Sequence, residues 1–241
     1  MIIDTNFNFY SDSNGSDPDS TSLTLRKYHK VLWSKSLPNG NLFELHDNKN
    51  GAYLYHKSKL GEFFLGSDAI THSYKNHKRK QWLTEQIPKE VNELFDAGST
   101  VGAYIVFPNN RIDGKHTINQ ARGVNSLIDD RFDLTLECIR LFYSGDKSPL
   151  YDTLLRYKKF FDLFDNFMGY VHFFLLDDLV DENYKIKFYL PFDGFRTRPT
   201  FSDVNQYLLY KKGVINFIKL RNKRIENYVK KIVKAKYDSS T

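Results

Sequence analysis

Side chains that could do chemistry are densest between residues 116 and 140. Arg122, Asp129, Asp130 and Arg131 fall there, between a predicted strand and a predicted helix. Loops held by rigid elements often carry binding residues, and a guanidinium suits a phosphate or a carboxylate. We therefore expect a polar ligand pocket for an anionic small molecule or a nucleotide. Alternatively, the segment is a capping loop, with Asp129 or Asp130 at the helix N-terminus and Arg122 bridging acids.

Two carboxylates on the helix predicted at residues 130–143 have the spacing of an acid–base pair. Asp133 and Glu137 stand four residues apart, so both project from one face. The helix is otherwise apolar nearly all round, which indicates burial, and buried charges need partners or must line a cavity. We expect Asp133 and Glu137, with His116, to be the catalytic residues. Alternatively, Glu137 pairs with Arg140 and Asp133 complements the helix N-terminus.

The C-terminal helix, predicted at residues 214–236, carries the excess positive charge of the chain. The net charge is +6, and residues 203–236 hold ten Lys or Arg against two acids. Five lysines fall within about 60° of one another on its outer face, where they could follow a nucleic-acid backbone or dock an acidic protein. A solvated surface explains the same pattern. These lysines are Lys212, Lys219, Lys223, Lys230 and Lys234.

Arg221 departs from that pattern, because it falls inside the apolar face of the same helix. A buried guanidinium needs an acid partner or a bound anion, and we expect an internal salt bridge. With Arg221 included, the candidate ligand-binding residues are Arg122, Asp129, Asp130, Arg131, Arg140 and Arg221.

Metal and cofactor chemistry finds little support in the pattern. The histidines show no metal-ligand spacing, and a lone cysteine, Cys138, provides neither a disulfide framework nor a Cys-based zinc site. No metal ligand is assigned and no cofactor can be named. The turn-rich residues 11–22 miss the spacing of a calcium loop, so we interpret them as capping turns. His29, on the apolar side of its predicted helix, is expected to be a hydrogen-bonded core residue.

The elements that must position these residues indicate an α+β fold, with a mostly antiparallel central sheet packed by several helices. Short strand-like runs at 42–45, 52–56 and 62–67 suggest a meander, and VGAYIVFP at 101–108 is the best buried strand. Residues 117–121 are expected to pair with it, and the segments 170–180 and 185–192 to form a hairpin. Because no linker interrupts the chain, we expect one domain over residues 1–241, with loosely ordered ends at 1–20 and 237–241.

No stretch approaches the roughly 20 apolar residues that span a bilayer, and the N-terminus does not resemble a signal peptide. We therefore expect a cytoplasmic protein that does not bind membranes.

Several phrases, taken together, resemble a family of uncharacterised bacterial proteins, a domain of unknown function. They are DPDSTSLTLRKYHKVLWSK, TINQARG, DRFDLTLECIR and SPLYDTLLRYKKFFDLF, and the resemblance covers roughly residues 4 to 228. It implies a bacterial, cytoplasmic, single-domain protein, and it carries over no activity, cofactor or catalytic residue. Three classes of function therefore stay open: a ligand-binding or enzymatic pocket, a nucleic-acid-associated protein, and a protein-interaction module.

Overall fold

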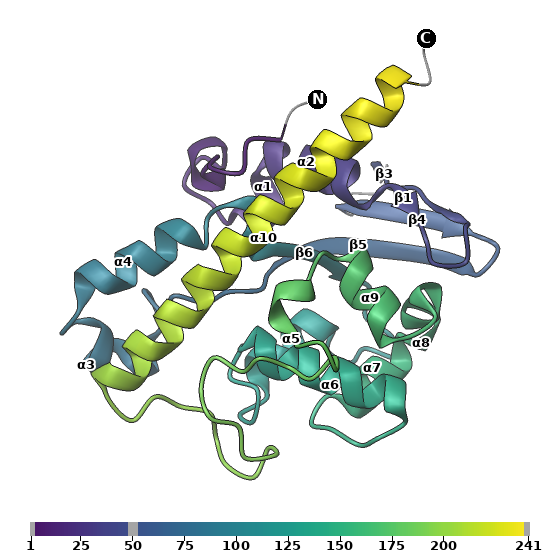
Figure 1. The fold of residues 1–241 in the computed structure, drawn as a ribbon. Helices are drawn as coiled ribbons and strands as arrows, with labels where there is room; N and C mark the ends of the chain where they lie inside the picture. The colour runs from purple at the N-terminus through teal and green to yellow at the C-terminus, as the bar shows by residue number, and fades with distance from the viewer. Residues whose placement is uncertain (1–2, 48–52, 239–241) are drawn as a thin grey trace.

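The centre of the fold is a small antiparallel sheet. The computed structural model describes residues 3–47 and 53–238 (Figure 1). Each strand of the sheet pairs antiparallel with its sequence neighbour, and all five residues of the last strand are buried, as the run VGAYIVFP predicts. The strands are β3 (His46–Asp47), β4 (Leu54–Ser58), β5 (Gly61–Ala69) and β6 (Tyr104–Pro108). A separate pair is formed by β1 (Lys35–Ser36) and β2 (Leu42–Phe43). The prediction of a mostly antiparallel sheet packed by helices is confirmed.

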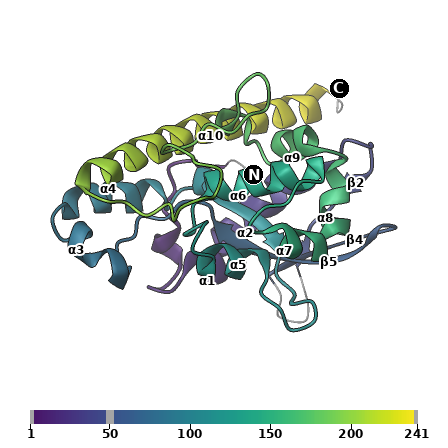
Figure 2. The same ribbon diagram turned by 90° about the horizontal axis from the view of Figure 1, so that it is seen from below.

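Helices cover both faces of this sheet. In Figure 1 the sheet runs between α2 on one side and the group α5–α9 on the other, and Figure 2 shows α5 and α7 in front of β5. The α-helices are α1 (Pro18–Thr21), α2 (Leu23–Trp33), α3 (Gln81–Thr84), α4 (Pro88–Ala97), α5 (Ile118–Val124), α6 (Phe132–Ser144), α7 (Tyr151–Arg156), α8 (Lys158–Phe161), α9 (Phe167–Phe173) and α10 (Val204–Asp238). Short 3-10 turns are η1 (Phe9–Asp12), η2 (Lys78–Lys80), η3 (Val101–Ala103), η4 (Asp162–Phe164) and η5 (Asp177–Leu179).

The long helix α10 lies across the molecule and contacts α4, η3 and η5 (Figure 1). It begins ten residues before the predicted start at Val214, and Ile218 and Ile225 face the core as its apolar period requires. Within the described part of the chain, no helix combines the length and the apolar character needed to cross a membrane.

Two predicted strand pairings are wrong. Residues 118–124 form α5, because Thr117 and Gln120 close a reciprocal capping box at its N-terminus. The expected hairpin after residue 170 is replaced by α9, which Asn166 caps by accepting from the Gly169 N–H, and a single bridge joins Val180 to Ile186. A short apolar run cannot distinguish a buried strand from a buried helix by its period.

The N-terminal segment packs against the body of the protein. Loose order is expected for residues 1–20, yet Ile3 and Phe9 contribute to the apolar core. Asp17 caps α1 through the Asp19 N–H, as the turn-rich composition predicts, and Pro18 takes the first helical position. Of the expected loose ends, residues 1–2 and 239–241 lie outside the described residues.

Candidate functional site

A polar cavity of about 410 Å³ lies where α1 meets the end of β5. Carboxylates gather on its wall: Asp17 and Asp19 come from the start of α1, Asp68 from β5, and Asp130 from the residues before α6. His72, just after β5, also lines it. We call this cavity the acidic pocket, defined by Asp17, Asp19, Asp68 and Asp130. Segments more than 100 residues apart in the sequence build it, so no local motif reveals it.

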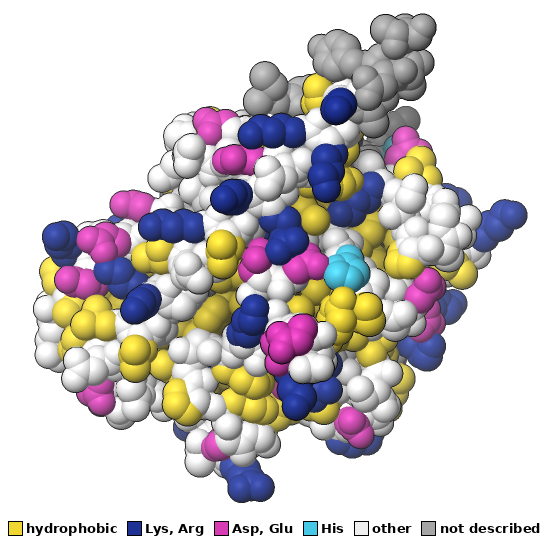
Figure 3. Space-filling model, in the orientation of Figure 1, with side chains coloured by type: hydrophobic (Ala, Val, Ile, Leu, Met, Phe, Trp, Pro, Cys, Tyr) yellow, Lys and Arg dark blue, Asp and Glu magenta, His cyan; other side chains and the backbone are white. Residues whose placement is uncertain are grey.

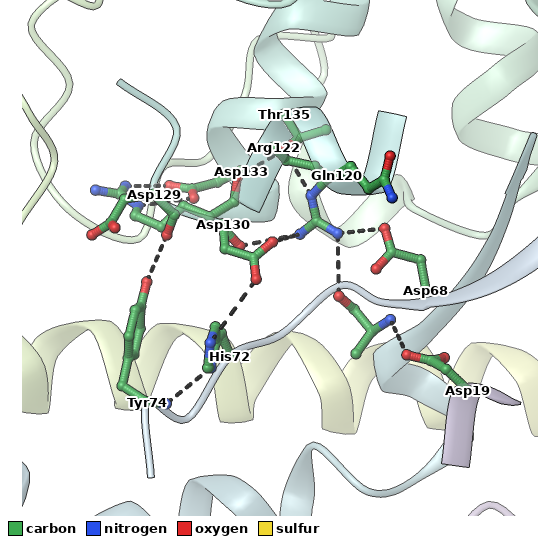
Figure 4. Close-up of polar contacts among 12 residues, drawn as sticks. Asp19, Asp68, His72, Tyr74, Gln120, Arg122, Asp129, Asp130, Asp133 and Thr135 are labelled. Atoms are coloured by element: carbon green, nitrogen blue, oxygen red, sulfur yellow. Dashed lines mark hydrogen bonds and ion pairs between the residues drawn. The ribbon is translucent and has the colours of Figure 1, made fainter. Parts of the chain in front are cut away.

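Behind the pocket wall, Arg122 joins two of these carboxylates. Figure 4 shows Asp68 and Asp130 on either side of its guanidinium. Nη1 lies 2.5 Å from Asp68 Oδ2, and Nη2 lies 3.3 Å from Asp130 Oδ1. The other contacts are Nε to Thr135 Oγ1, Nη1 to the Ala69 carbonyl and Nη2 to the Asp130 carbonyl. The guanidinium therefore donates four hydrogen bonds and forms an ion pair with Asp130, so its charge is directed to the wall and not to the cavity.

Burial and charge set the ionisation of this pair. Arg122 is fully buried, which lowers its pKa, but the carboxylates of Asp68 and Asp130 outweigh burial and raise that pKa. Burial raises the pKa of Asp68 to about 6. At neutral pH the guanidinium is charged and Asp68 is ionised, so Arg122 balances one of the two carboxylates that it contacts.

Asp19 closes the free edge of the sheet. Among the described residues, β4 pairs with β5 no further than Leu65, and Asp19 approaches the last residues of β5 on that side. Asp19 Oδ2 accepts from the Ala69 N–H at 3.2 Å, and Oδ1 accepts from Ser67 Oγ at 2.5 Å. Burial, the charge of Asp68 and the charge of Asp17 raise the pKa of Asp19 to about 7. A carboxyl group that titrates near neutral pH suits proton exchange with a ligand.

His72 lies flat against Tyr74, with ring centroids 4.5 Å apart and planes 3° from parallel. Its Nδ1 accepts from the Tyr74 N–H at 3.0 Å, and its Nε2 lies 4.0 Å from Asp130 Oδ2 (Figure 4). Burial lowers the pKa of His72 despite the neighbouring Asp130. The imidazole is therefore neutral at pH 7, and it contributes no positive charge to the pocket.

The structure separates the predicted ligand-binding residues from one another. Asp130 lines the acidic pocket and Arg122 supports it, whereas Asp129 and Arg131 border other cavities. Asp129 accepts from Tyr74 through its carbonyl and lies 3.4 Å from Lys80 Nζ. Arg122 thus bridges acids, as the capping-loop alternative has it, but the N-cap of α6 is Arg131 and not Asp129 or Asp130.

The predicted catalytic residues lie outside the acidic pocket. Asp133 is fully buried and accepts from Arg131 at 2.5 Å and from the Tyr189 N–H at 3.0 Å. Glu137 accepts two hydrogen bonds of 2.8 Å from Arg140, one turn away. His116 is exposed, and its carbonyl accepts from Arg156. Asp133 and Glu137 thus form ion pairs with Arg131 and Arg140, which are close to them in the sequence. The pairing of Glu137 with Arg140 is the alternative given above for this helix.

The salt bridge expected for Arg221 is wrong. Its guanidinium donates to three backbone carbonyls, those of Gly102, Tyr104 and Phe174, each at 2.9 Å. Its carbon Cζ lies 5.7 Å from the centroid of the Trp33 ring. No carboxylate of the described residues lies within 4.0 Å, because α10 brings Arg221 to the start of β6, where the nearest acceptors are main-chain oxygens.

Sequence reasoning missed Asp19, Asp68 and His72 as site residues. The capping turns predicted for residues 11–22 are correct for Asp17 but not for Asp19, whose carboxylate accepts from the Ala69 N–H of β5. A signal did exist for Asp68, since an acid inside the apolar run EFFLGSDAI must find a partner when the strand is buried. Which partner it finds depends on α5.

The five lysines of α10 are all exposed. Figure 3 shows Lys and Arg side chains following one another along this helix. None of the five lies within 4.0 Å of a carboxylate in the described chain, so their charges face solvent. As for metals, residues 3–47 and 53–238 contain no group of three or more His, Cys, Asp or Glu side chains arranged to hold an ion.

A family model described as a family of unknown function (DUF6994) matches residues 3–225. The match confirms the resemblance seen in the sequence, and it covers every residue of the acidic pocket. Neither a curated protein nor a solved structure matches the chain.

Proposed function

This chain belongs to the DUF6994 family of unknown function, and we propose that its acidic pocket binds a small hydrophilic ligand carrying a protonated amine. The observation that carries this proposal is the imbalance of charge at the pocket. Asp17, Asp19, Asp68 and Asp130 line it, while the guanidinium of Arg122 lies behind the wall and is engaged by Asp68 and Asp130. An ammonium group there replaces lost water contacts with charge-assisted hydrogen bonds.

The proposal reverses the ligand charge that the sequence suggests. Lys75 also lines the pocket, but its ammonium lies over the Phe95 ring, 4.4 Å from the centroid. Arg122 balances one of the four carboxylates and Asp19 is about half ionised at pH 7, so one lysine at the wall does not offset the charge that remains. A pocket with an excess of one charge concentrates ligands of the opposite sign.

Proton exchange with the bound amine is the chemistry that this arrangement supports best. A general base acts best when its pKa lies near the working pH, and Asp19, with a pKa of about 7, meets that condition. We infer an enzyme in which Asp19 accepts a proton from the ligand, Asp68 and Asp130 hold the cation, and the neutral His72 ring faces Asp130.

The experiment is a binding titration followed by NMR shifts of backbone amides around Ala69. The probes are ethylamine, ethanolamine and 1,4-diaminobutane, with inorganic phosphate and acetate as anionic comparators. We expect the amines to shift these amides, and Asp130→Asn to weaken their binding about tenfold, the loss of one charge-assisted contact. Ser99→Ala is the matched control, because Ser99 lines the pocket but donates to the Phe95 carbonyl.

Two outcomes would contradict the proposal. Shifts caused by phosphate but not by amines would restore the anionic ligand. Equal affinity of the wild-type protein and Asp130→Asn for the amines would place the amine site elsewhere.

A second function rests on a separate observation, the exposed lysines of α10. From Lys212 to Lys234 the helix rises about 33 Å, close to one turn of duplex DNA at about 34 Å. A cationic stripe of this length can neutralise phosphates along one turn. We propose sequence-tolerant nucleic-acid binding by this face, independent of the acidic pocket.

A charge-reversed variant tests the stripe against a labelled 20-base-pair duplex. Lys219→Glu, Lys223→Glu and Lys230→Glu combined should abolish a binding that weakens steeply with salt. Reversal of the exposed Lys115, Lys159 and Lys187 changes the net charge equally and should have a smaller effect. Equal loss in both variants would attribute binding to net charge, and preference for poly-L-glutamate over the duplex would indicate an acidic protein partner.

A further inference from the structure

A chain of hydrogen bonds runs from the apolar core to the acidic pocket. The Trp33 indole N–H donates to His29 Nδ1 at 2.9 Å, His29 Nε2 lies 3.0 Å from Ser67 Oγ, and Ser67 Oγ donates to Asp19 Oδ1 at 2.5 Å. Trp33 and His29 are fully buried. The expectation that His29 is a hydrogen-bonded core residue therefore holds, but its bonds lead to the site.

The donor and the acceptor of each hydrogen bond in this series are fixed. An indole N–H can only donate, so His29 Nδ1 must accept and carries no hydrogen. Burial, reinforced by the charge of Arg221, lowers the pKa of His29 to about 3, so the ring is neutral. A neutral imidazole without a proton on Nδ1 has it on Nε2. His29 Nε2 then donates to Ser67, and the Ser67 hydrogen points at Asp19.

Ser, His and Asp side chains in contact suggest a nucleophile with its base, but the order here excludes that chemistry. In a serine-nucleophile triad the imidazole accepts from the serine, and the carboxylate accepts from the imidazole. Here Asp19 accepts from Ser67, and His29 has no lone pair left on either ring nitrogen in the plane of the ring. His29 cannot take the Ser67 proton, so Ser67 is not activated.

We propose that Ser67, His29 and Trp33 are positioning residues that hold Asp19 as the proton acceptor of the acidic pocket, with Oδ2 as the exchanging atom. This inference rests on the proposed function. Oδ1 receives the short bond from Ser67, whereas Oδ2 receives one bond of 3.2 Å from the Ala69 N–H. The proton therefore leaves the amine nitrogen and bonds to Oδ2, the less strongly engaged oxygen.

Other groups near Asp19 do not provide a competing donor. Asp17 and Asp68 are the charged groups that act on it, and both are acids that raise its pKa. Burial, together with the charge of Asp19, raises the pKa values of the Tyr53 and Tyr104 hydroxyls, but the hydrogen bonds to the Asp19 carboxylate come from Ser67 and from the Ala69 N–H. Ser67 is thus the side chain that stabilises the ionised form of Asp19.

The test measures the ligand-free protein, so its outcome does not depend on any amine binding. In the wild-type protein, 15N shifts should show His29 as the Nε2-protonated neutral tautomer from pH 5 to 9. The 13C shift of the Asp19 carboxyl should titrate near neutral pH. Ser67→Ala removes the hydrogen bond to the carboxylate and should raise the Asp19 midpoint by about one pH unit, whereas Ser99→Ala should leave it in place.

Trp33→Phe tests whether the indole N–H sets the tautomer of His29 and so the donor in each hydrogen bond that follows. Without the indole donor, His29 can place its proton on Nδ1 and accept from Ser67, so the Asp19 midpoint should rise as in Ser67→Ala. Trp82→Phe is the matched control, because Trp82 is exposed. An Nδ1-protonated or charged His29 in the wild-type protein would overturn the proposal, and so would covalent labelling of Ser67 by diisopropyl fluorophosphate. Amine binding that fails while the tautomer and midpoints behave as expected would reject the proposed function and leave the fixed hydrogen-bond chain established.

Discussion

Arg122 and Arg221 are both fully buried on helices, yet their surroundings differ in kind. Arg122 meets two carboxylates, Asp68 and Asp130, and also donates to Thr135 Oγ1 and to the Ala69 and Asp130 carbonyls. Arg221 meets three neutral carbonyls, and its Nε finds no acceptor among the described residues. The carboxylates raise the pKa of Arg122, whereas burial lowers the pKa of Arg221 to about 9.

The difference shows which region is built around charge. At Arg122, a cation and two anions assemble one wall of the acidic pocket, and the spare negative charge faces the cavity. At Arg221, the guanidinium joins α10 to the start of β6 and to the end of α9 through main-chain oxygens. A fork of donors that reaches three carbonyls at once stabilises packing.

The largest expected effect comes from breaking the charged wall. Arg122→Met leaves the buried Asp68 without its cation, and loss of one partner from a buried pair costs about 3–5 kcal/mol. Adding Asp68→Asn should recover a large part of that loss, because the orphaned charge disappears. Urea unfolding at pH 7 measures both variants. Additive losses in the double variant would show that the pair is not coupled.

A smaller loss of stability is expected at Arg221, whose hydrogen-bond partners are uncharged carbonyls. Arg221→Met leaves three carbonyls without this donor, at about 1 kcal/mol each, so the free energy of unfolding should fall by about 3 kcal/mol. No acid removal should rescue it. Asp178→Asn, beside Arg224, should simply add its own effect. Rescue by Asp178→Asn would mean that Arg221 is balanced by that acid, and the contrast with Arg122 would disappear.

The pH dependence of stability sharpens the comparison on the acidic side. Asp19 has a folded pKa of about 7, mainly through burial, above an unfolded value of about 3.9. Its contribution is full below pH 4 and is lost as the pH rises to about 7. His29 has a folded pKa of about 3, below an unfolded value of about 6.5, so its contribution is present above pH 6.5 and is lost as the pH falls.

These two contributions oppose each other between pH 4 and 6.5, and Asp68, with a folded pKa of about 6, adds to the loss from Asp19, so the profile of the wild-type protein alone does not isolate Asp19. Asp19→Asn removes one of them. The unfolding free energy of wild type minus that of Asp19→Asn should fall by up to about 1.4 kcal/mol per pH unit between pH 4 and 7 and level off above. Thermal unfolding in a pH series measures it. A difference that does not vary with pH would show that Asp19 titrates as an ordinary carboxyl.

The smallest effect is expected where cations face water on the same helix as Arg221. The triple reversal of Lys219, Lys223 and Lys230 to Glu should change the free energy of unfolding by about 0.5 kcal/mol or less per site, since exposed charges contribute little. A loss as large as that of Arg221→Met would mean that these lysines hold the fold together. It would also remove this variant as a test of nucleic-acid binding.

The sequence by itself determined the features that depend on local period and capping. The apolar stripe and Gly145 place α6 within two residues of its predicted bounds, and the left-handed backbone at Gly145 ends the helix. The outward direction of the α10 lysines follows from 3.6 residues per turn. The pairing of Glu137 with Arg140 was available as an alternative, since both lie on one helix turn.

Only the tertiary structure decided which distant groups meet. Asp19 and Ser67, or Asp68 and Arg122, come together because α1 and α5 pack on opposite sides of the end of β5, and no spacing within one segment encodes that approach. Local pattern shows that a buried charge needs a partner, but it cannot choose between a carboxylate and a carbonyl. For that reason Arg122 and Arg221 have different partners, and the ion pairs of Arg122 with Asp68 and Asp130 form one wall of the acidic pocket.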